Sequence, residues 1–204
     1  MTPCIRGPEP EVLAREGAQI GRHYAARRRE ALGYRFQWPH RDGRSLLEVV
    51  REALSIMTAG HCSYCDAHPL GATDVEAVDH FRPKSHPAFY ELVCTWTNLF
   101  LTCTACNHAK REQWDEALLR PDDPDFHFER YFEYRFDSGK LEPAAAASSD
   151  EQLRARRTIE IFDLNRAGAC ANRKRAVHLM TLADVELEDH AYRYLIPLCR
   201  AGRP

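Results

Sequence analysis

The chain has 204 residues, of which 44% are hydrophobic and 28% charged, with 8 cysteines and a formal net charge of -2 at pH 7. These values exclude a chain that is disordered throughout or uniformly basic, and they fit one compact domain with at most a small helical appendage. No apolar run approaches the roughly 20 residues needed to cross a bilayer, and the first residues lack the apolar segment of a signal peptide, so we expect a soluble cytoplasmic protein with no membrane contact.

The first 55 residues predict an N-terminal helical region. Residues 9–32 are rich in Ala, Arg and Glu, which favour helix. Ser45 and Glu48 form a capping-box pattern at the start of a second helix, in which apolar residues recur at helical spacing. Between residues 22 and 44 seven arginines and two acids give a local charge of +5. Such a segment is as often a solvated helix face as a contact for phosphate.

Four of the cysteines form two closely spaced pairs. They are Cys62, Cys65, Cys103 and Cys106, arranged as C-x2-C, 37 intervening residues and C-x2-C. A two-residue spacer lets a tight turn point both sulfurs of a pair at one ion, and two such pairs complete a tetrahedral zinc site. We therefore predict a structural Zn2+ ion bound by these four thiolates. A disulfide framework is the weaker alternative, because the sequence shows no secretory signal.

The segment between the two pairs places an acid beside a histidine near the end of a predicted strand. Residues 75–81 alternate in hydrophobicity as a strand does, and they contain Asp79 and His80. A carboxylate there can bind Mg2+ or Mn2+, and an imidazole can take a proton from water. Arg82 and Lys84 follow and are expected to contact phosphate. A surface turn explains an isolated Asp-His pair equally well, but the position between two zinc-binding pairs favours a site.

Polar residues also flank the second cysteine pair. Asn98 precedes it, and Asn107 directly follows Cys106. Lys110 comes three residues after Asn107, a spacing that places both on one face of a helix. We expect the zinc ion to hold this helix against the strand that carries His80.

The next segment is acidic and contains several prolines. Between residues 112 and 133 eight acids and two arginines give a local charge of -6. Three prolines lie within residues 121–147, together with a turn signal at Ser138-Gly139 between two short apolar runs, and an Ala/Ser-rich stretch spans residues 144–149. We predict a linker with a short β-hairpin over residues 121–147.

Residues 148–204 predict a C-terminal helical region. Ser148 and Glu151 form a second capping-box pattern, and the helix that they start breaks near Leu164-Asn165 before helical spacing resumes. Between residues 154 and 175 seven basic residues and two acids give another local charge of +5. This region and the N-terminal one are both candidates for contact with nucleic acid or with a partner protein.

Taken together, these motifs resemble the HNH endonuclease family. The resemblance rests on C-x2-C, D-H-F-R-P-K, W-x-N-L and C-x2-C-N-x2-K, and the wider pattern, with S-G-K-L-E-P and I-F-D-L-N-R, is similar to the HNH nuclease subunits of Septu (PtuB-like) and retron-associated anti-phage systems. It covers roughly residues 55 to 180. The resemblance implies an α+β, mainly helical fold in which residues 56–120 form a ββα-metal core, stapled by the four-cysteine zinc site and flanked by N- and C-terminal helices.

The resemblance also implies a role for each matched residue. His80 corresponds to the general base, and Asp79 and Asn107 correspond to ligands of a catalytic Mg2+ or Mn2+ ion. Asn98 corresponds to the residue that orients the His-bearing loop or supports the metal. Many members carry His at the last position, so an amide oxygen there favours Mg2+ or Mn2+ over catalytic zinc, with His108 as the alternative ligand. The implied nucleic-acid contacts are Arg82, Lys84 and Lys110.

The implied function is metal-dependent hydrolysis of nucleic-acid phosphodiester bonds, with DNA favoured over RNA. The protein would be the effector nuclease of a bacterial anti-phage complex, a hetero-oligomer with an ATPase subunit of the ABC or overcoming-lysogenization (OLD) type. One alternative is a non-catalytic zinc-stabilised module that binds nucleic acid or protein, which leaves the Asp-His pair and the two asparagines as coincidence. Another is the same nuclease chemistry directed at RNA, since chemistry at one metal neither requires nor excludes a 2′-hydroxyl.

Overall fold

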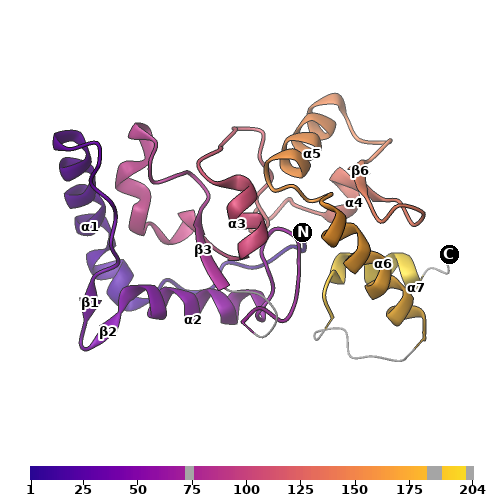
Figure 1. Ribbon diagram of the computed structural model, residues 1–204, viewed down its shortest axis with the longest axis horizontal. Coiled ribbons are helices and arrows are strands. Elements are labelled where there is room, and N and C mark those ends of the chain that lie inside the picture. Colours follow the sequence, from indigo (N-terminus) through magenta and orange to yellow (C-terminus); the bar gives the residue numbers. More distant parts are fainter. Residues whose placement is uncertain (72–75, 183–189, 201–204) are drawn as a thin grey trace.

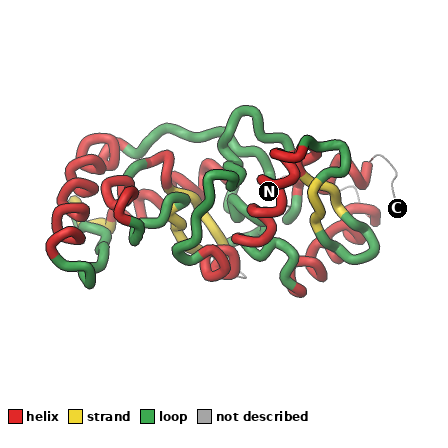
Figure 2. Tube along the Cα trace, turned by 90° about the horizontal axis from the view of Figure 1, so that it is seen from above, coloured by secondary structure: helices red, strands yellow, loops and turns green. Residues whose placement is uncertain are grey.

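The computed structural model describes residues 1–71, 76–182 and 190–200. Helices predominate, and the strands of the described ranges form two-stranded antiparallel sheets. The elements follow one another along an elongated molecule, with α1 at one end, β3 and α3 in the middle and α6 and α7 at the other end (Figure 1). The view from above shows the same elongated shape (Figure 2). The predicted α+β, mainly helical class is therefore confirmed.

The elements have the following bounds. The α-helices are α1 (Glu11–Glu30), α2 (Leu46–Thr58), α3 (Thr104–Lys110), α4 (Phe128–Tyr131), α5 (Ser149–Ile161), α6 (Ala167–Leu182) and α7 (Ile196–Arg200). The strands are β1 (His40–Arg41), β2 (Arg44–Ser45), β3 (Glu76–His80), β4 (Leu99–Cys103), β5 (Phe132–Tyr134) and β6 (Leu141–Pro143). The 3-10 helices are η1 (Pro87–Cys94), η2 (Trp96–Asn98) and η4 (Arg193–Leu195). Within the described ranges, no helix combines the length and apolar character needed to span a bilayer.

Helix α1 lies unusually close to η1 because two glycines face it. A Cβ atom on Gly17 would lie 2.7 Å from the carbonyl oxygen of Cys94, and one on Gly21 would overlap the carbonyl oxygen of Glu91. Only a residue without a side chain allows this approach of backbone to backbone. The helix begins and ends two residues inside the predicted range, since Pro10 precedes its first turn and Ala31 is extended. This packing holds the N-terminal region against the middle of the molecule.

Helix α2 has the predicted capping box, and it ends shortly before the first cysteine pair. The Ser45 hydroxyl accepts a hydrogen bond from the Leu47 N–H, and the Ser45 N–H donates to Glu48. Its apolar face buries Leu46, Val50 and Leu54 in the core. The helix ends at Thr58. The next two residues, Ala59 and Gly60, have positive φ and turn the chain sharply toward Cys62.

The middle of the molecule has the order strand, strand, helix. β3 pairs antiparallel with β4, so that Asp79 lies opposite Phe100 and His80 opposite Leu99. All of β4 is buried, and α3 follows it directly. This is the order expected for a ββα core, with η1 and η2 inserted between the strands. Val75, the first residue of the predicted strand, lies outside the described residues.

The C-terminal half docks on this middle part through the segment after α5. The predicted capping box of Ser148 and Glu151 is present, and the predicted hairpin is formed by β5 and β6. The ring of Phe162 stacks on that of Tyr64 at 3.7 Å between centroids. The Asn165 side chain accepts from the Leu141 N–H and donates to the Leu141 carbonyl, each at 2.8 Å. Of the predicted C-terminal region, residues 183–189 and 201–204 lie outside the described residues.

Candidate metal centre and catalytic cavity

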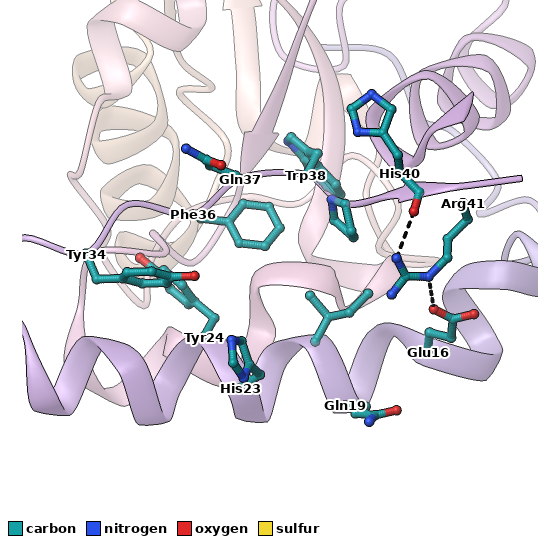
Figure 3. Close-up of a pocket in the computed structure, with 12 residues that line it drawn as sticks. Glu16, Gln19, His23, Tyr24, Tyr34, Phe36, Gln37, Trp38, His40 and Arg41 are labelled. Carbon is teal, nitrogen blue, oxygen red and sulfur yellow. Dashed lines mark hydrogen bonds and ion pairs between the residues drawn. The ribbon is translucent and has the colours of Figure 1, made fainter. Parts of the chain in front are cut away.

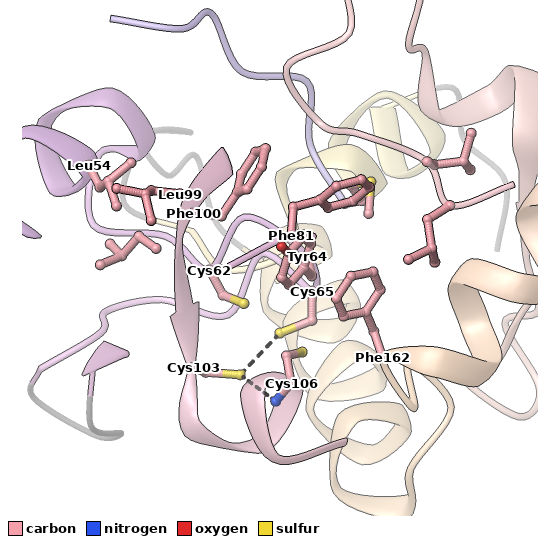
Figure 4. Packing of buried hydrophobic residues seen from close by; sticks show 14 of the residues in the cluster. Leu54, Cys62, Tyr64, Cys65, Phe81, Leu99, Phe100, Cys103, Cys106 and Phe162 are labelled. Atoms are coloured by element: carbon pink, nitrogen blue, oxygen red, sulfur yellow. Dashed lines mark hydrogen bonds between the residues drawn. The ribbon is translucent and has the colours of Figure 1, made fainter. Parts of the chain in front are cut away.

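Four buried cysteines from two places in the chain lie together. Cys62 and Cys65 lie in the turn after α2, while Cys103 and Cys106 lie where β4 meets α3. Their sulfur atoms all lie within 4.8 Å of one another, and Figure 4 shows them gathered beside the rings of the core. The sulfurs of Cys65 and Cys103 are 3.7 Å apart. This matches the separation of about 3.8 Å for two thiolates that each lie about 2.3 Å from a tetrahedral ion. The four-cysteine cluster is therefore as predicted, and it could hold a metal ion such as zinc.

Arg166 connects the C-terminal half to this cluster. Its guanidinium N–H groups lie 3.6 Å from the sulfur of Cys106 and 3.8 Å from those of Cys65 and Cys103. Four thiolates carry more negative charge than one divalent ion neutralises, so a guanidinium beside them stabilises the metal-binding form. The sequence pattern I-F-D-L-N-R thus has a physical basis: its Phe packs on Tyr64, its Asn holds the hairpin and its Arg contacts the sulfurs.

Three of the predicted catalytic residues line one cavity of about 590 Å³. Asp79 and His80 contribute from β3, and Asn107 contributes from α3. The basic side chains that line the same cavity are Arg28, Arg35, Lys84 and Arg111. They outnumber the acids that line it, Asp79 and Glu112. The charge of the lining therefore favours an anionic ligand such as a phosphate.

His80 is held in one orientation and one tautomer. Its Nε2 lies 2.9 Å from the carbonyl oxygen of Val93, and because a carbonyl can only accept, Nε2 carries the proton. Nδ1 is then the nitrogen with a free lone pair. Burial lowers the pKa of His80 to about 3, with a further lowering from the charges of Lys84 and Lys110. The imidazole is therefore neutral at physiological pH.

Asp79 belongs to a buried hydrogen-bond network at the wall of the cavity. Its Oδ2 accepts a hydrogen bond of 2.7 Å from the hydroxyl of Tyr64, and its Oδ1 lies 3.0 Å from the Nζ of Lys110. A carboxylate has about four acceptor positions, so two are used and two are left for other ligands. Because Tyr64 also stacks on Phe162, Asp79 is connected through one ring to the segment that contacts the cysteine sulfurs.

The position of Lys110 differs from the prediction. The side chain is fully buried, and its Nζ donates to Asp79 and, at 2.7 Å, to the carbonyl oxygen of His80. The expected contact with nucleic acid does not fit this position, because the ammonium group has no access to solvent. Instead it joins α3 to the strand that carries the Asp-His pair.

Asn98 orients the chain around His80 through backbone contacts. Its Oδ1 accepts from the Arg82 N–H at 2.8 Å, and its Nδ2 donates to the carbonyls of Arg82 and Leu92 at 3.1 and 3.2 Å. It does not line the cavity of Asp79, His80 and Asn107. These contacts fit the expected orienting role better than direct support of a metal.

The other predicted residues divide between the cavity and its surroundings. Lys84 lines the cavity, whereas the Arg82 guanidinium lies 5.7 Å from the centre of the Phe89 ring, outside the lining. Asn107 lines it as well, but its neighbour His108 is exposed and does not. Of the two candidate ligands on α3, the structure therefore places the asparagine beside Asp79 and His80.

Sequence reasoning missed the aromatic residues that cover His80 from the N-terminal region. The Trp38 ring lies nearly parallel to the imidazole, with 6.0 Å between centroids and 26° between planes. The Phe36 ring approaches it edge-on at 6.3 Å. An available signal was the alternation of aromatic residues at positions 34, 36 and 38, which is typical of an extended segment with one covered face.

The comparisons with known proteins support a PtuB-like Septu relationship. No family model matches the chain. It is 25% identical over 174 residues to the Septu protein PtuB of Bacillus mycoides (strain KBAB4), covering 70% of this chain and 55% of that protein. It is 24% identical over 159 residues to the Septu protein PtuB of Bacillus thuringiensis, covering 76% of this chain and 56% of that protein. The chain thus spans about half the length of the curated relatives that it matches.

Proposed function

We propose that this PtuB-like chain is a metal-dependent HNH endonuclease that hydrolyses phosphodiester bonds of nucleic acid, with DNA favoured over RNA. The observation that carries the proposal is the cavity in which Asp79, His80 and Asn107 lie together under a basic lining. A purely structural zinc module requires none of these three side chains at one surface. The fixed tautomer of His80 supports the same conclusion.

In this proposal His80 is the general base. Nδ1 accepts a proton from a water molecule that attacks the phosphorus, while the Val93 carbonyl holds Nε2 and prevents the ring from turning. Asn98 acts as a positioning residue, because it fixes the backbone on both sides of the turn that follows His80. Lys84 and the arginines of the cavity bind the phosphate and offset its charge.

Asp79 and Asn107 are the residues that would hold a catalytic Mg2+ or Mn2+ ion. Their oxygens are the hard ligands that these ions prefer, and Asp79 retains unused acceptor positions beside its two hydrogen bonds. Such an ion would stabilise the charge that develops on the phosphate and on the leaving oxygen. The Lys110 ammonium holds the carboxylate in place through its 3.0 Å contact with Oδ1.

We assign a structural Zn2+ ion to the four cysteines. Four buried thiolates at tetrahedral spacing would otherwise repel one another, and a structural zinc site contributes its binding energy to folding. The ion would fix the turn after α2 to the start of α3 and so bring Asn107 to the cavity that Asp79 and His80 line. Arg166 would then make the C-terminal half sensitive to the state of the metal centre.

The relationship to Septu proteins supports a biological role as the effector nuclease of an anti-phage defence complex. We propose that an ATPase subunit of the ABC or OLD type restrains or triggers it in a hetero-oligomer, which would explain how the host tolerates the nuclease. Recovery of the native protein alone, monomeric and constitutively active, would contradict this part of the proposal.

The experiment that tests the proposed activity is incubation of the purified protein, with whatever co-purifies, against supercoiled plasmid and total RNA. Each substrate is tested with Mg2+, with Mn2+ and without added divalent ion. We expect nicked and linear plasmid only when the ion is added, and weaker or no degradation of RNA. Binding without cleavage under every condition would favour the non-catalytic zinc module, and cleavage confined to RNA would favour the RNA-directed nuclease.

A further inference from the structure

A second cavity, of about 530 Å³, lies beside the catalytic one between α1 and the segment of residues 34–41. Figure 3 shows this segment running back along α1, with side chains from both directed into the space between them. At one end Arg41 Nε and Glu16 Oε2 lie 2.5 Å apart and close the cavity with an ion pair. The volume is within the range of about 300–1,000 Å³ that is usual for small-molecule sites.

The lining of this second cavity is aromatic. Tyr24, Tyr34, Phe36 and Trp38 all line it, and neighbouring rings lie at 5.0 to 6.1 Å between centroids. The exposed imidazole of His23 also lines it. Flat rings, imidazole included, are the surfaces on which unpaired bases stack.

The two cavities share part of their lining. Tyr24, Tyr34 and Phe36 line both, and the rings of Phe36 and Trp38 are the ones that contact the imidazole of His80. A ligand in the second cavity would therefore lie one aromatic side chain away from the general base. A group of that size so close to a scissile phosphate is most simply another part of the same nucleic-acid strand.

The two cavities differ in charge as the two parts of a nucleotide do, one being suited to an anionic phosphate and the other to an uncharged base. The catalytic cavity has an excess of basic side chains, which suits a phosphate. In the second cavity the only acid and the only arginine among the lining residues pair with each other. Its interior is left mainly with aromatic rings, which suit an uncharged base.

We propose that this aromatic cavity is a subsite for one unpaired nucleobase next to the scissile phosphate, an inference that rests on the proposed nuclease function. A base that is stacked and paired in a duplex cannot enter the cavity. The enzyme therefore selects single-stranded substrate, or duplex sites at which a base is displaced. DNA and RNA share this chemistry, and oligonucleotides of each kind distinguish them.

The test is binding of a single-stranded oligonucleotide that contains one 2-aminopurine, in buffer without added Mg2+ or Mn2+. The full-length protein should quench the fluorescence of this base, and a duplex of the same sequence should bind more weakly. Tyr34→Ala should reduce the single-strand affinity by about 5- to 100-fold, the range for loss of one stacking partner. Phe136→Ala, which removes a partly buried ring from the β-hairpin far along the chain, is the matched control and should bind as the unaltered protein does.

His23→Ala provides a second variant if Tyr34→Ala fails to fold. Its side chain is exposed and lines only the second of the two cavities, so loss of this ring should leave the fold intact and reduce the affinity for single strands at least about 5-fold. Equal affinity of the unaltered protein and these variants, or no quenching by the unaltered protein, would overturn the proposal. Hydrolysis of bis(4-nitrophenyl) phosphate with Mn2+ reports the nuclease function separately, because this diester has no base. Quenching without hydrolysis would contradict the function alone, and hydrolysis without quenching would contradict the subsite alone.

Discussion

Replacement of Lys110 by methionine tests whether this residue holds the core together or contacts nucleic acid. In the structure its ammonium is fully buried and donates to Asp79 and to the carbonyl of His80. Lys110→Met keeps most of the aliphatic volume and removes the charge. The carboxylate of Asp79 is then left buried with only the hydroxyl of Tyr64 as partner.

The expected cost follows from the burial of this ion pair. Removal of one partner of a buried pair costs about 3–5 kcal/mol, because the remaining charge is neither solvated nor neutralised. For a chain of this size 1 kcal/mol corresponds to about 2–4 °C, so the melting temperature should fall by about 6 to 20 °C. The double variant Asp79→Asn with Lys110→Met has no orphaned charge and should recover part of this loss.

The measurement is thermal and urea unfolding without added divalent ion, combined with the salt dependence of DNA binding. Lys84→Met is the matched control, because Lys84 lines the proposed catalytic cavity but is exposed. Lys84→Met should change the free energy of unfolding by less than about 0.5 kcal/mol. It should also lower the steepness with which the logarithm of the DNA-binding constant falls with the logarithm of the salt concentration, by about one. If Lys110→Met instead kept its stability and weakened DNA binding as Lys84→Met does, the structural role of Lys110 would be refuted.

Three further predictions concern residues that hold the metal centre and the fold around the cavity in place. Cys103→Ser, or removal of zinc with a chelator, should unfold the middle of the molecule, which circular dichroism and zinc quantification by mass spectrometry would detect together. Gly21→Ala should destabilise the fold by more than the few tenths of a kcal/mol typical of an exposed helix site, because its Cβ would overlap the Glu91 carbonyl, and calorimetry would measure the loss. Arg166→Gln should release zinc to a competing chelator about 10- to 100-fold more readily, with little change in helix content.

The parts of the fold that depend on local pattern could be predicted from the sequence. Both capping boxes were predictable because Ser and Glu three residues apart satisfy each other's backbone groups, whatever the rest of the chain does. The cysteine cluster was predictable because two C-x2-C pairs have the spacing at which four sulfurs can share one ion. The hairpin was predictable because Gly139 adopts the positive φ that the turn requires.

The parts that depend on distant contacts could not be predicted. Spacing placed Lys110 on one helix face with Asn107, but only the packing of α3 on β3 decides that the lysine is buried against Asp79. The alternation of rings at positions 34, 36 and 38 indicates one covered face, but nothing local indicates that the group beside Phe36 and Trp38 is the imidazole of His80. The near-neutral net charge likewise concealed a basic cavity that includes arginines from the first 35 residues.

The most direct test of the central claim is cleavage of supercoiled plasmid by the His80→Ala variant in the presence of Mn2+. We predict a loss of about 10²- to 10⁴-fold in rate, the usual contribution of a general base, in a variant that stays folded and keeps the zinc content of the unaltered protein. His108→Ala is the matched control, since it removes an imidazole that is exposed on α3 and outside the cavity, and it should cleave at the unaltered rate. Cleavage by His80→Ala at the rate of His108→Ala, with both proteins folded and zinc-loaded, would contradict the assignment of this cavity as the catalytic centre.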